Sequence, residues 1–298
     1  MKLKSIISFS LLLMLGNASH AQQIFTISQF TQHNFLFNPA AAGASDDASI
    51  GAAYRKMWAG IDGGPQTTLL YFDKYFEKKK AGLAVVLYDD KTGPTSRSGG
   101  QVNLSYSIDM QQGRRLMFGL AGNVMQYKIN KAVLQQYIPN DPLLAGSDNT
   151  IKADAAAGIY YKSPTLNLGF SVQQLVQSKF NFIKTTNNPS GKLYRHFYMM
   201  GSYNWKVDDD NVLIPNAMVQ YLPNAPVYYS AGIRLEHRDM FWVGGNYHHQ
   251  QSYSLFAGVK VDHKLAIGYA FDQYNTPLSV FDDGSGAHEI SLRYFFKR

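Results

Sequence analysis

The stretch QVNLSYSID, residues 101–109, decides the fold because its apolar and polar side chains alternate without interruption. The apolar set is Val102, Leu104, Tyr106 and Ile108, and the polar set is Asn103, Ser105, Ser107 and Asp109. Successive side chains of a strand point to opposite faces, so this period of two predicts a strand with one apolar and one polar face. The same alternation occurs in LNLGFSVQ (166–173), YSLFAGVKVD (253–262) and LAIGYAFD (265–272).

Such runs recur along the whole chain. We expect about 14 strands of roughly ten residues, the length that a tilted strand needs to cross a membrane. Their expected extents are 48–58, 66–76, 81–89, 99–110, 114–129, 153–162, 166–176, 195–207, 212–222, 226–237, 240–249, 252–262, 264–274 and 287–296. The predicted fold is all-β: a transmembrane antiparallel up-and-down β-barrel of the outer-membrane type, with the apolar sets facing lipid.

The connections between these strands support the barrel. In an outer-membrane barrel with a periplasmic N-terminus, the connections after even-numbered strands are short turns and the others are longer outer loops. The even set is brief: EKKK (77–80), QQGR (111–114), KSPT (162–165), DDDN (208–211), HRD (237–239) and a turn around His263. The odd set includes DKTGPTSRSG (90–99), 130–150, 178–194 and TPLSVFDDGSG (276–286), with shorter LPNA (222–225) and HHQQS (248–252). A β-sandwich has no reason to sort its loops in this way.

The two ends of the chain indicate export and barrel assembly. Residues 1–23, MKLKSIISFSLLLMLGNASHAQQ, place two lysines before a short apolar run and small residues, which is the layout of a secretory signal peptide. We expect cleavage after Ala21, a lead segment over 22–47 and the barrel over 48–298. The lead segment lacks alternation and is compatible with the periplasm or with the barrel lumen. The last strand, HEISLRYFFKR (288–298), carries aromatic residues almost to its end, which resembles the assembly signal of outer-membrane barrels.

Composition excludes several classes of function. Removing Lys2 and Lys4 with the signal peptide lowers the formal net charge from +7 to +5, and only EKKK is locally dense in basic residues. Nucleic-acid binding is therefore not expected, because it requires a concentrated basic surface. The chain has no cysteine, which excludes disulfides and thiolate metal sites.

Two stretches carry a family resemblance: QFTQHNFLFNPAAAG (29–43) and YRKMWAGIDGGPQTTLL (54–70). Together they resemble the PorP/SprF family of type IX secretion system outer-membrane proteins. The resemblance implies a non-enzymatic role in the export or surface attachment of proteins with a type IX C-terminal signal, including gliding adhesins. It also implies contact with periplasmic secretion and motor components and with outer-membrane lipid. The signature residues, which we expect to serve structure or partner contact, are Asn38, Pro39, Gly43, Tyr54, Arg55, Trp58, Gly60, Asp62, Gly63 and Pro65.

The sequence offers little sign of catalysis or ligand binding. His248 and His249 lie near Ser252 and Ser254, but without a nearby carboxylate, so we expect exposed loop histidines rather than a triad. The acidic clusters at 208–211, 282–284 and 140–149 could bind calcium, yet Asx and Gly residues are also what turns require. GIDGG (60–64) is followed by a strand and not by the helix of a phosphate loop, which favours a turn. Trp58 would then join an interfacial aromatic girdle. We therefore expect neither catalytic residues nor a cofactor or metal.

Charged residues on the predicted polar faces suggest how the lumen is filled. We expect six of them in the periplasmic half of the lumen: Arg234, Glu236, Lys260, Asp262, Glu289 and Arg293. Charges of both signs in a low-dielectric lumen require partners or water. A mixed lattice favours a closed scaffold, whereas a wide pore would keep the charges solvated. The alternative function is an outer-membrane channel, either a porin or a FadL-like carrier of small or apolar molecules.

Overall fold

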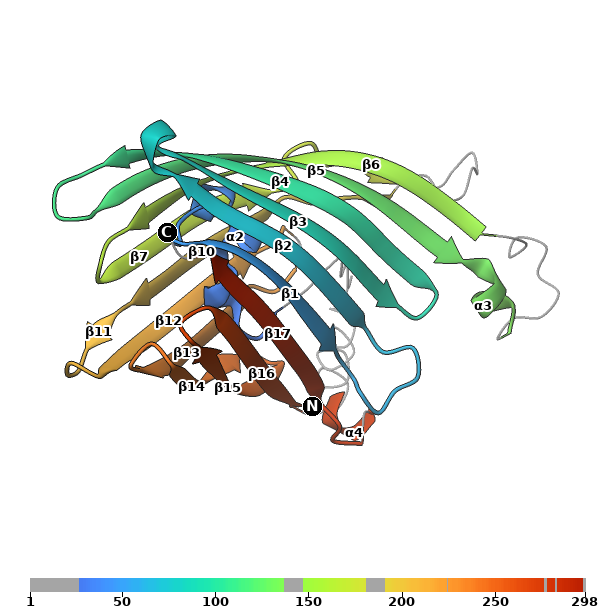
Figure 1. The fold of residues 1–298 in the computed structure, drawn as a ribbon. Helices are drawn as coiled ribbons and strands as arrows, with labels where there is room; N and C mark the ends of the chain where they lie inside the picture. The colour runs from blue at the N-terminus through green and yellow to red at the C-terminus, as the bar shows by residue number, and fades with distance from the viewer. Residues whose placement is uncertain are drawn as a thin grey trace, which may run out of the picture.

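One closed β-barrel accounts for most of the protein (Figure 1). The computed structural model describes residues 27–136, 147–180, 191–223, 225–275, 278–281 and 283–296. The strands of the large sheet follow chain order, β1 pairs with β17, and β10 pairs with β12, which closes the ring. β11 (Trp205–Lys206) only extends one edge beside β12. The prediction of a 14-strand antiparallel barrel is confirmed.

The wall strands reproduce the predicted extents closely, and the bounds of β2 and β17 agree with them at both ends. The strands are β1 (Ala48–Lys56), β2 (Gln66–Phe76), β3 (Ala81–Thr92), β4 (Thr95–Asp109), β5 (Arg115–Asn130), β6 (Ser147–Lys162), β7 (Leu166–Gln173), β10 (His196–Tyr203), β12 (Asn211–Tyr221), β13 (Tyr228–His237), β14 (Phe241–His248), β15 (Ser252–Val261), β16 (Leu265–Tyr274) and β17 (Ala287–Phe296).

Several short elements are not part of the barrel wall. η1 (Phe30–Gln32), α2 (Asn34–Phe37) and η2 (Pro39–Ala41) precede the barrel, and η3 (Glu77–Lys79) forms the turn between β2 and β3. α3 (Lys131–Gln135), α4 (Leu278–Phe281) and the small pair β8 (Lys179–Phe180) and β9 (Gly191–Lys192) belong to the longer connections.

Tight turns identify the periplasmic end of the barrel. β1 begins and β17 finishes at this end, where Ala48 lies opposite Phe296. The turns after β2, β4, β6, β13 and β15 gather there, and the long connections leave from the other, outer end. In outer-membrane barrels the short turns are periplasmic. The expected alternation of short turns and longer loops therefore agrees with the topology.

The exposed face of the wall is apolar, whereas the lumen face carries most of the polar side chains together with an apolar patch, the reverse of a soluble protein. On β4, Leu104 is 58% exposed while Asn103 is 0% exposed. Leu120 on β5 and Leu255 on β15 are 67% and 70% exposed. Such a surface is stable only against hydrocarbon, and the closed ladder satisfies the backbone there.

None of the helices in the described ranges is long and apolar enough to cross a membrane.

The expected outer loop at 90–99 is wrong, because strand pairing continues through it. β3 runs to Thr92 and β4 starts at Thr95, so only Gly93 and Pro94 connect them. Gly93 has φ +53°, the positive value that the first central residue of a tight hairpin turn adopts. The alternation in TSRSGG was obscured because small and polar residues fill both faces there.

The strands from β3 to β6 extend beyond the apolar band at the outer end. β5 and β6 each contain 16 residues. Along the outward face of β5, exposed Leu120 and Val124 give way to Gln126 and Lys128. This polar extension runs toward α3 and projects past the rest of the rim (Figure 1).

Candidate functional site

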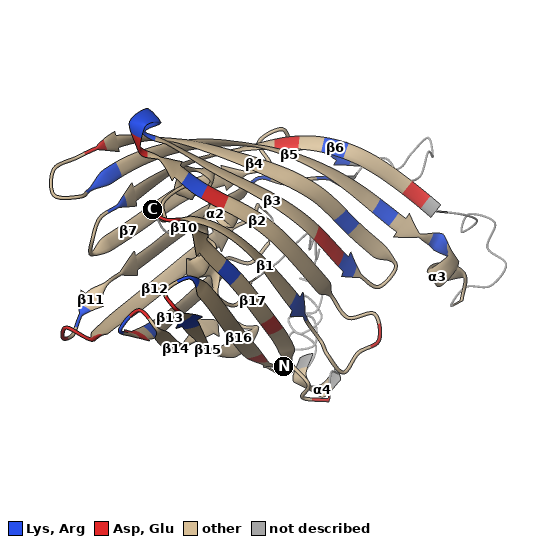
Figure 2. Cartoon of the chain, in the orientation of Figure 1, with Lys and Arg blue, Asp and Glu red and all other residues tan. Residues whose placement is uncertain are grey.

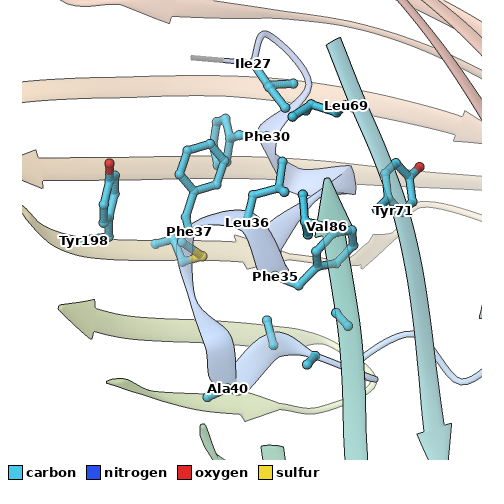
Figure 3. Close-up of a cluster of buried hydrophobic side chains, with 14 of the residues drawn as sticks. Ile27, Phe30, Phe35, Leu36, Phe37, Ala40, Leu69, Tyr71, Val86 and Tyr198 are labelled. Atoms are coloured by element: carbon cyan, nitrogen blue, oxygen red, sulfur yellow. The ribbon is translucent and has the colours of Figure 1, made fainter. Parts of the chain in front are cut away.

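The segment of residues 27–47 lies inside the barrel. Its side chains Phe30, Phe35, Leu36 and Phe37 are between 1% and 7% exposed. They pack in one cluster with inward side chains of the wall, including Leu69, Tyr71, Val86 and Tyr198 (Figure 3). Burying each large apolar side chain contributes about 1.5–3 kcal/mol. Over its described residues, the lead segment therefore occupies the lumen rather than the periplasm.

Asn38 joins this segment to the wall through its side chain. Its Nδ2 donates to the backbone oxygens of Ile159 on β6, at 3.0 Å, and of Phe170 on β7, at 3.3 Å. Its Oδ1 accepts from the backbone N–H of Ala40 at 2.9 Å and so caps η2, in which Pro39 is the first residue. Asn38 is fully buried, and an asparagine supplies both the donor and the acceptor that this position uses.

Four wall glycines make room for the segment. A Cβ atom on Gly82 would lie 1.9 Å from the Ala42 oxygen, and one on Gly119 would lie 2.2 Å from the Ala40 nitrogen. At Gly158 and Gly169 the added atom would meet the Asn38 side chain at 2.1 and 2.8 Å. These positions lie on β3, β5, β6 and β7, so the backbone of residues 38–42 rests directly on one side of the wall.

Gly43 turns the segment toward the periplasmic rim. It has φ +69°, and a Cβ atom there would lie 2.8 Å from the Gly82 Cα. Its N–H donates to the buried carboxylate of Asp73 on β2 at 2.6 Å. Only glycine satisfies both the positive φ and the close approach.

Asp46 fastens the segment at the rim. It pairs with Arg115 at the start of β5 and with Lys162 at the end of β6, at 3.0 Å for the latter. Partial burial raises the pKa of the Asp46 carboxyl, but the charges and hydrogen bonds of Lys162 and Arg115 outweigh this and hold the pKa below its usual range. The Lys162 Nζ also donates to the Ala44 oxygen at 2.5 Å.

A buried charged cluster holds the other end of the segment near the outer rim. Arg55 on β1 pairs with Asp272 on β16 and, at 3.4 Å, with Glu289 on β17. The Ser28 N–H donates to Glu289 at 2.7 Å, and the Ser28 hydroxyl donates to Asp272 at 2.9 Å. The Arg55 guanidinium also donates to the Ser28 hydroxyl. Because all of these residues are buried, each carboxylate depends on Arg55 and Ser28 for compensation of its charge.

His248 joins this cluster, and the expectation that it is an exposed loop histidine is wrong. It is 4% exposed at the end of β14, and its Nε2 lies 2.7 Å from the Ser254 hydroxyl. Ser254 donates in turn to Asp272 at 2.5 Å. A carboxylate is thus close, but the serine stands between histidine and aspartate, whereas a triad places the histidine in the middle. His249 stacks on Tyr229 at 4.1 Å, and Ser252 is buried.

The six expected lumen charges separate into three groups. Arg234, Glu236, Lys260 and Arg293 line the periplasmic half of the lumen, as expected. Glu289 lies near the outer end, because the chain enters β17 from an outer connection and Glu289 is its third residue. Asp262 follows the last residue of β15 and is exposed in the turn, with φ +50°.

The four periplasmic charges surround a cavity of about 290 Å³ beside the segment. Arg234 pairs with Glu236 at 2.7 Å, and Lys260 pairs with Asp239 of the turn after β13 at 2.9 Å. Arg293 donates to the Gln32 backbone oxygen at 3.1 Å and so also contacts the segment. The inward polar faces thus form one network with the lead segment, although the cavity leaves part of the lumen unfilled.

The GIDGG stretch is a connection at the outer end. Gly63 has φ +75° and its oxygen accepts from the Gly93 N–H at 2.8 Å, which ties this loop to the hairpin of β3 and β4. The Ala59 N–H donates to the Gly286 oxygen across the neighbouring connection at 3.0 Å. Asp62 is exposed. GIDGG therefore joins adjacent outer connections.

The remaining signature residues occupy both faces of β1 and the loop. Tyr54 points outward and is 43% exposed, whereas Arg55 points into the lumen. Trp58 lies beyond the end of β1 with φ +51°, so it belongs to the loop and not to the strand as expected. Gly60 is exposed, and the Pro65 oxygen accepts from the Met57 N–H at 2.8 Å, which closes the loop.

The expected turn chemistry is present at 208–211. The Asp208 carboxylate accepts from the backbone N–H groups of Asp210 and Asn211, both at 2.8 Å. Across the described part of the chain, no group of three or more acidic or histidine side chains is arranged to hold a metal ion. The clusters at 140–149 and 282–284 each fall partly outside the described residues.

Sequence reasoning missed most partners of the signature residues. Asp272 ends the polar set of LAIGYAFD and Asp73 lies on β2. The alternation of these strands could have predicted that both side chains point into the lumen. The wall glycines gave no such sequence signal, because glycine in a strand gives no indication of which segment approaches it.

Comparisons with known proteins agree with this architecture. The family described as "Type IX secretion system membrane protein PorP/SprF" matches residues 19–294. No curated protein matches the chain significantly.

Several solved structures share the fold at low sequence identity. A CymD monoaromatic hydrocarbon channel has a TM-score of 0.58 and 11% identity over 89% of this chain and 93% of that chain. The P. putida toluene transporter TodX has a TM-score of 0.51 and 9% identity over 88% and 93%. A Pseudomonas aeruginosa FadL homologue has a TM-score of 0.50 and 12% identity over 87% and 93%. At these identities the likeness concerns the barrel fold alone.

Proposed function

The chain belongs to the PorP/SprF family of type IX secretion system membrane proteins, and from this premise we propose its specific role. It acts as a non-enzymatic outer-membrane scaffold that supports export or surface attachment of secreted proteins, such as gliding adhesins. It links these proteins to the periplasmic secretion and motor machinery. In this proposal the precursor is exported and cleaved after Ala21.

One observation carries the scaffold proposal: residues 27–47 occupy much of the lumen and are held at both ends. Ser28 is bound by Glu289 and Asp272 near the outer rim, and Asp46 is bound by Lys162 at the periplasmic rim. Removing a segment held in this way would expose paired charges and a large apolar cluster. A lumen occupied in this way offers no wide open path, which supports a scaffold over an open porin.

The two ends of the barrel suggest separate partners. The polar extension of β3 to β6 offers an outer surface to secreted proteins. The periplasmic turns are short, and η3 with Lys78, Lys79 and Lys80 presents a basic turn there (Figure 2). We propose that periplasmic components dock on this side and cargo on the outer side.

Mild solubilisation of the native protein, followed by mass spectrometry of what co-purifies, tests this role. We expect periplasmic ring or motor components and a surface protein with a type IX signal. A variant in which Lys78, Lys79 and Lys80 are all replaced by Gln should lose its periplasmic partners only. A photo-crosslinker at Lys128 of the outer extension should capture cargo. Cargo captured only from the turns would contradict the assignment of faces.

The alternative is a porin or a FadL-like channel, and the 290 Å³ periplasmic cavity favours it. In that case the cavity would be one end of a path, and the segment would have to move. A solute-uptake defect in a deletion strain, without any co-purifying secretion component, would support the channel against the scaffold.

A further inference from the structure

We propose that the periplasmic cavity binds a peptide segment that carries a carboxylate next to an aromatic or aliphatic side chain. This inference goes beyond the secretion role and does not depend on it, because it rests on the lumen geometry and is tested on the purified barrel.

Small inward residues keep this side of the lumen hollow. Gly258 on β15 pairs directly with Gly268 on β16, while Ala266 on β16 lies opposite Lys260 and Gly244 on β14 lies opposite Phe256. Trp242 covers two of them: a Cβ atom on Gly258 would lie 2.0 Å from its ring, and one on Gly268 would lie 3.2 Å away. The Trp242 indole donates to Gln29 of the segment at 3.1 Å, which fixes the ring against the wall. Of these residues, Trp242 and Ala266 line the cavity.

Four cations line the cavity, of which Lys162 on β6 is already paired with Asp46. Arg234, Lys260 and Arg293 come from β13, β15 and β17, and their side chains are 13–16% exposed. The Lys260 partner, Asp239, is 63% exposed in the turn, and Arg293 approaches Asp73 only to 3.8 Å. The Arg234 Nε is buried without a hydrogen-bond partner among the described residues. Donors therefore remain available for an anion.

Aromatic rings lie beside the cations. Lys260 and Arg293 both stand over the Phe295 ring, at 4.6 and 4.8 Å from its centroid. With Trp242 this ring gives the cavity an apolar surface next to its charges. A ligand that fits has one anionic group and one apolar group close together.

The carboxylates in the lining select against a more highly charged anion. Asp73, Glu236 and Asp239 share the cavity with the cations and would repel a dianion such as phosphate more than a carboxylate. The cavity is open to the periplasm, and a carboxylate beside an aromatic or aliphatic side chain is what a peptide segment presents. The chemistry thus points to a peptide delivered from that compartment.

Titration of the purified full-length barrel in detergent with N-acetyl-Ala-Phe, followed by ligand-observed NMR, tests this site. We expect saturable binding that weakens about tenfold or more when the C-terminal carboxylate is replaced by the amide, as expected for loss of a charge-assisted hydrogen bond. Equal binding of acid and amide would overturn the proposal. Displacement by inorganic phosphate at equal concentration would also overturn it, because the site would then be a general anion site.

Substitutions in the cavity test whether the peptide binds there. Arg234→Gln with Lys260→Gln should weaken binding of the acid about tenfold, whereas Lys206→Gln, which removes an exposed charge on β11, should leave the affinity unchanged. Ala266→Leu keeps every charge but fills the hollow, and it should also reduce binding. Heat-dependent gel migration and circular dichroism verify folding of each variant. Unchanged affinity in both folded cavity variants would contradict the site.

Discussion

The two sides of the barrel wall receive the same N-terminal segment in different ways. On the side of β3 to β7, glycines let the backbone of residues 38–42 lie against the strands. On the side of β13 to β17, contact depends on hydrogen bonds and charged groups of the wall side chains, and a cavity remains at the periplasmic end. The difference shows that small inward residues alone do not determine filling. The lumen is filled where the N-terminal segment packs against the small residues. It stays hollow where the Trp242 ring covers them.

The largest expected effect concerns the charged contact. Arg55→Gln leaves Asp272 and Glu289 buried without their cation, which should cost about 3–5 kcal/mol of stability. Denaturant unfolding in lipid vesicles measures the loss. The matched control is Arg238→Gln, which removes a cation from the exposed turn pair with Asp210 and should change little. Equal effects of the two substitutions would show that the outer cluster does not hold the segment.

The glycine contact is the next test. Gly119→Ala places a Cβ atom 2.2 Å from the Ala40 nitrogen, and such overpacking costs about 1–3 kcal/mol. Gly122→Ala on the same strand meets nothing within 4 Å and serves as the control. We expect only the first variant to expose the segment to protease. If both barrels resist alike, the segment does not rest on the glycine side.

An effect of similar size is expected from Asn38→Ala, which removes the hydrogen bonds to β6, β7 and Ala40. Unsatisfied groups left in this buried site should cost about 1–3 kcal/mol. Asn204→Ala, at an exposed turn where the side chain bonds the Pro164 oxygen, provides the comparison. Hydrogen exchange of residues 38–43 should increase in the first variant alone.

The smallest effect is a dependence on pH at the periplasmic rim. The folded pKa of Asp46 lies below its usual value, so its ion pairs stabilise the rim fully above the ordinary pKa of about 3.9 and lose this contribution as pH falls through the lowered folded value. Because the chain lacks cysteine, Ser45→Cys accepts a single spin label. Its mobility should rise only under strongly acidic conditions, and Asp46→Asn should abolish that response. A transition at neutral pH would exclude Asp46 as its source.

The strands were predictable because lipid-facing and lumen-facing residues alternate along each strand of a membrane barrel. The bounds of β17, with Ile290, Leu292 and Tyr294 outward, followed from this period alone. Prediction failed where side chains were small or polar on both faces, as in the extension of β4 through Ser96 and Ser98. There the register with β5 decides the structure, and register is a long-range property.

The site was less accessible to prediction than the fold. Arg55 was named as a signature residue, but its partners lie 217 and 234 positions away in the sequence. His248 lies within the expected strand 240–249 but was expected to be exposed near its outer end, whereas its side chain is buried in the lumen. The inward direction of Arg234, Lys260 and Arg293 was foreseeable from alternation, whereas the hollow between them depends on Trp242 covering Gly258.

The central claim, that residues 27–47 close the lumen, is tested most directly by single-channel conductance in planar lipid bilayers. The intact protein should give no large stable current, and a barrel lacking residues 27–45 should conduct once it is shown to fold. Large, stable currents through the intact protein, equal to those of the deletion, would contradict the account.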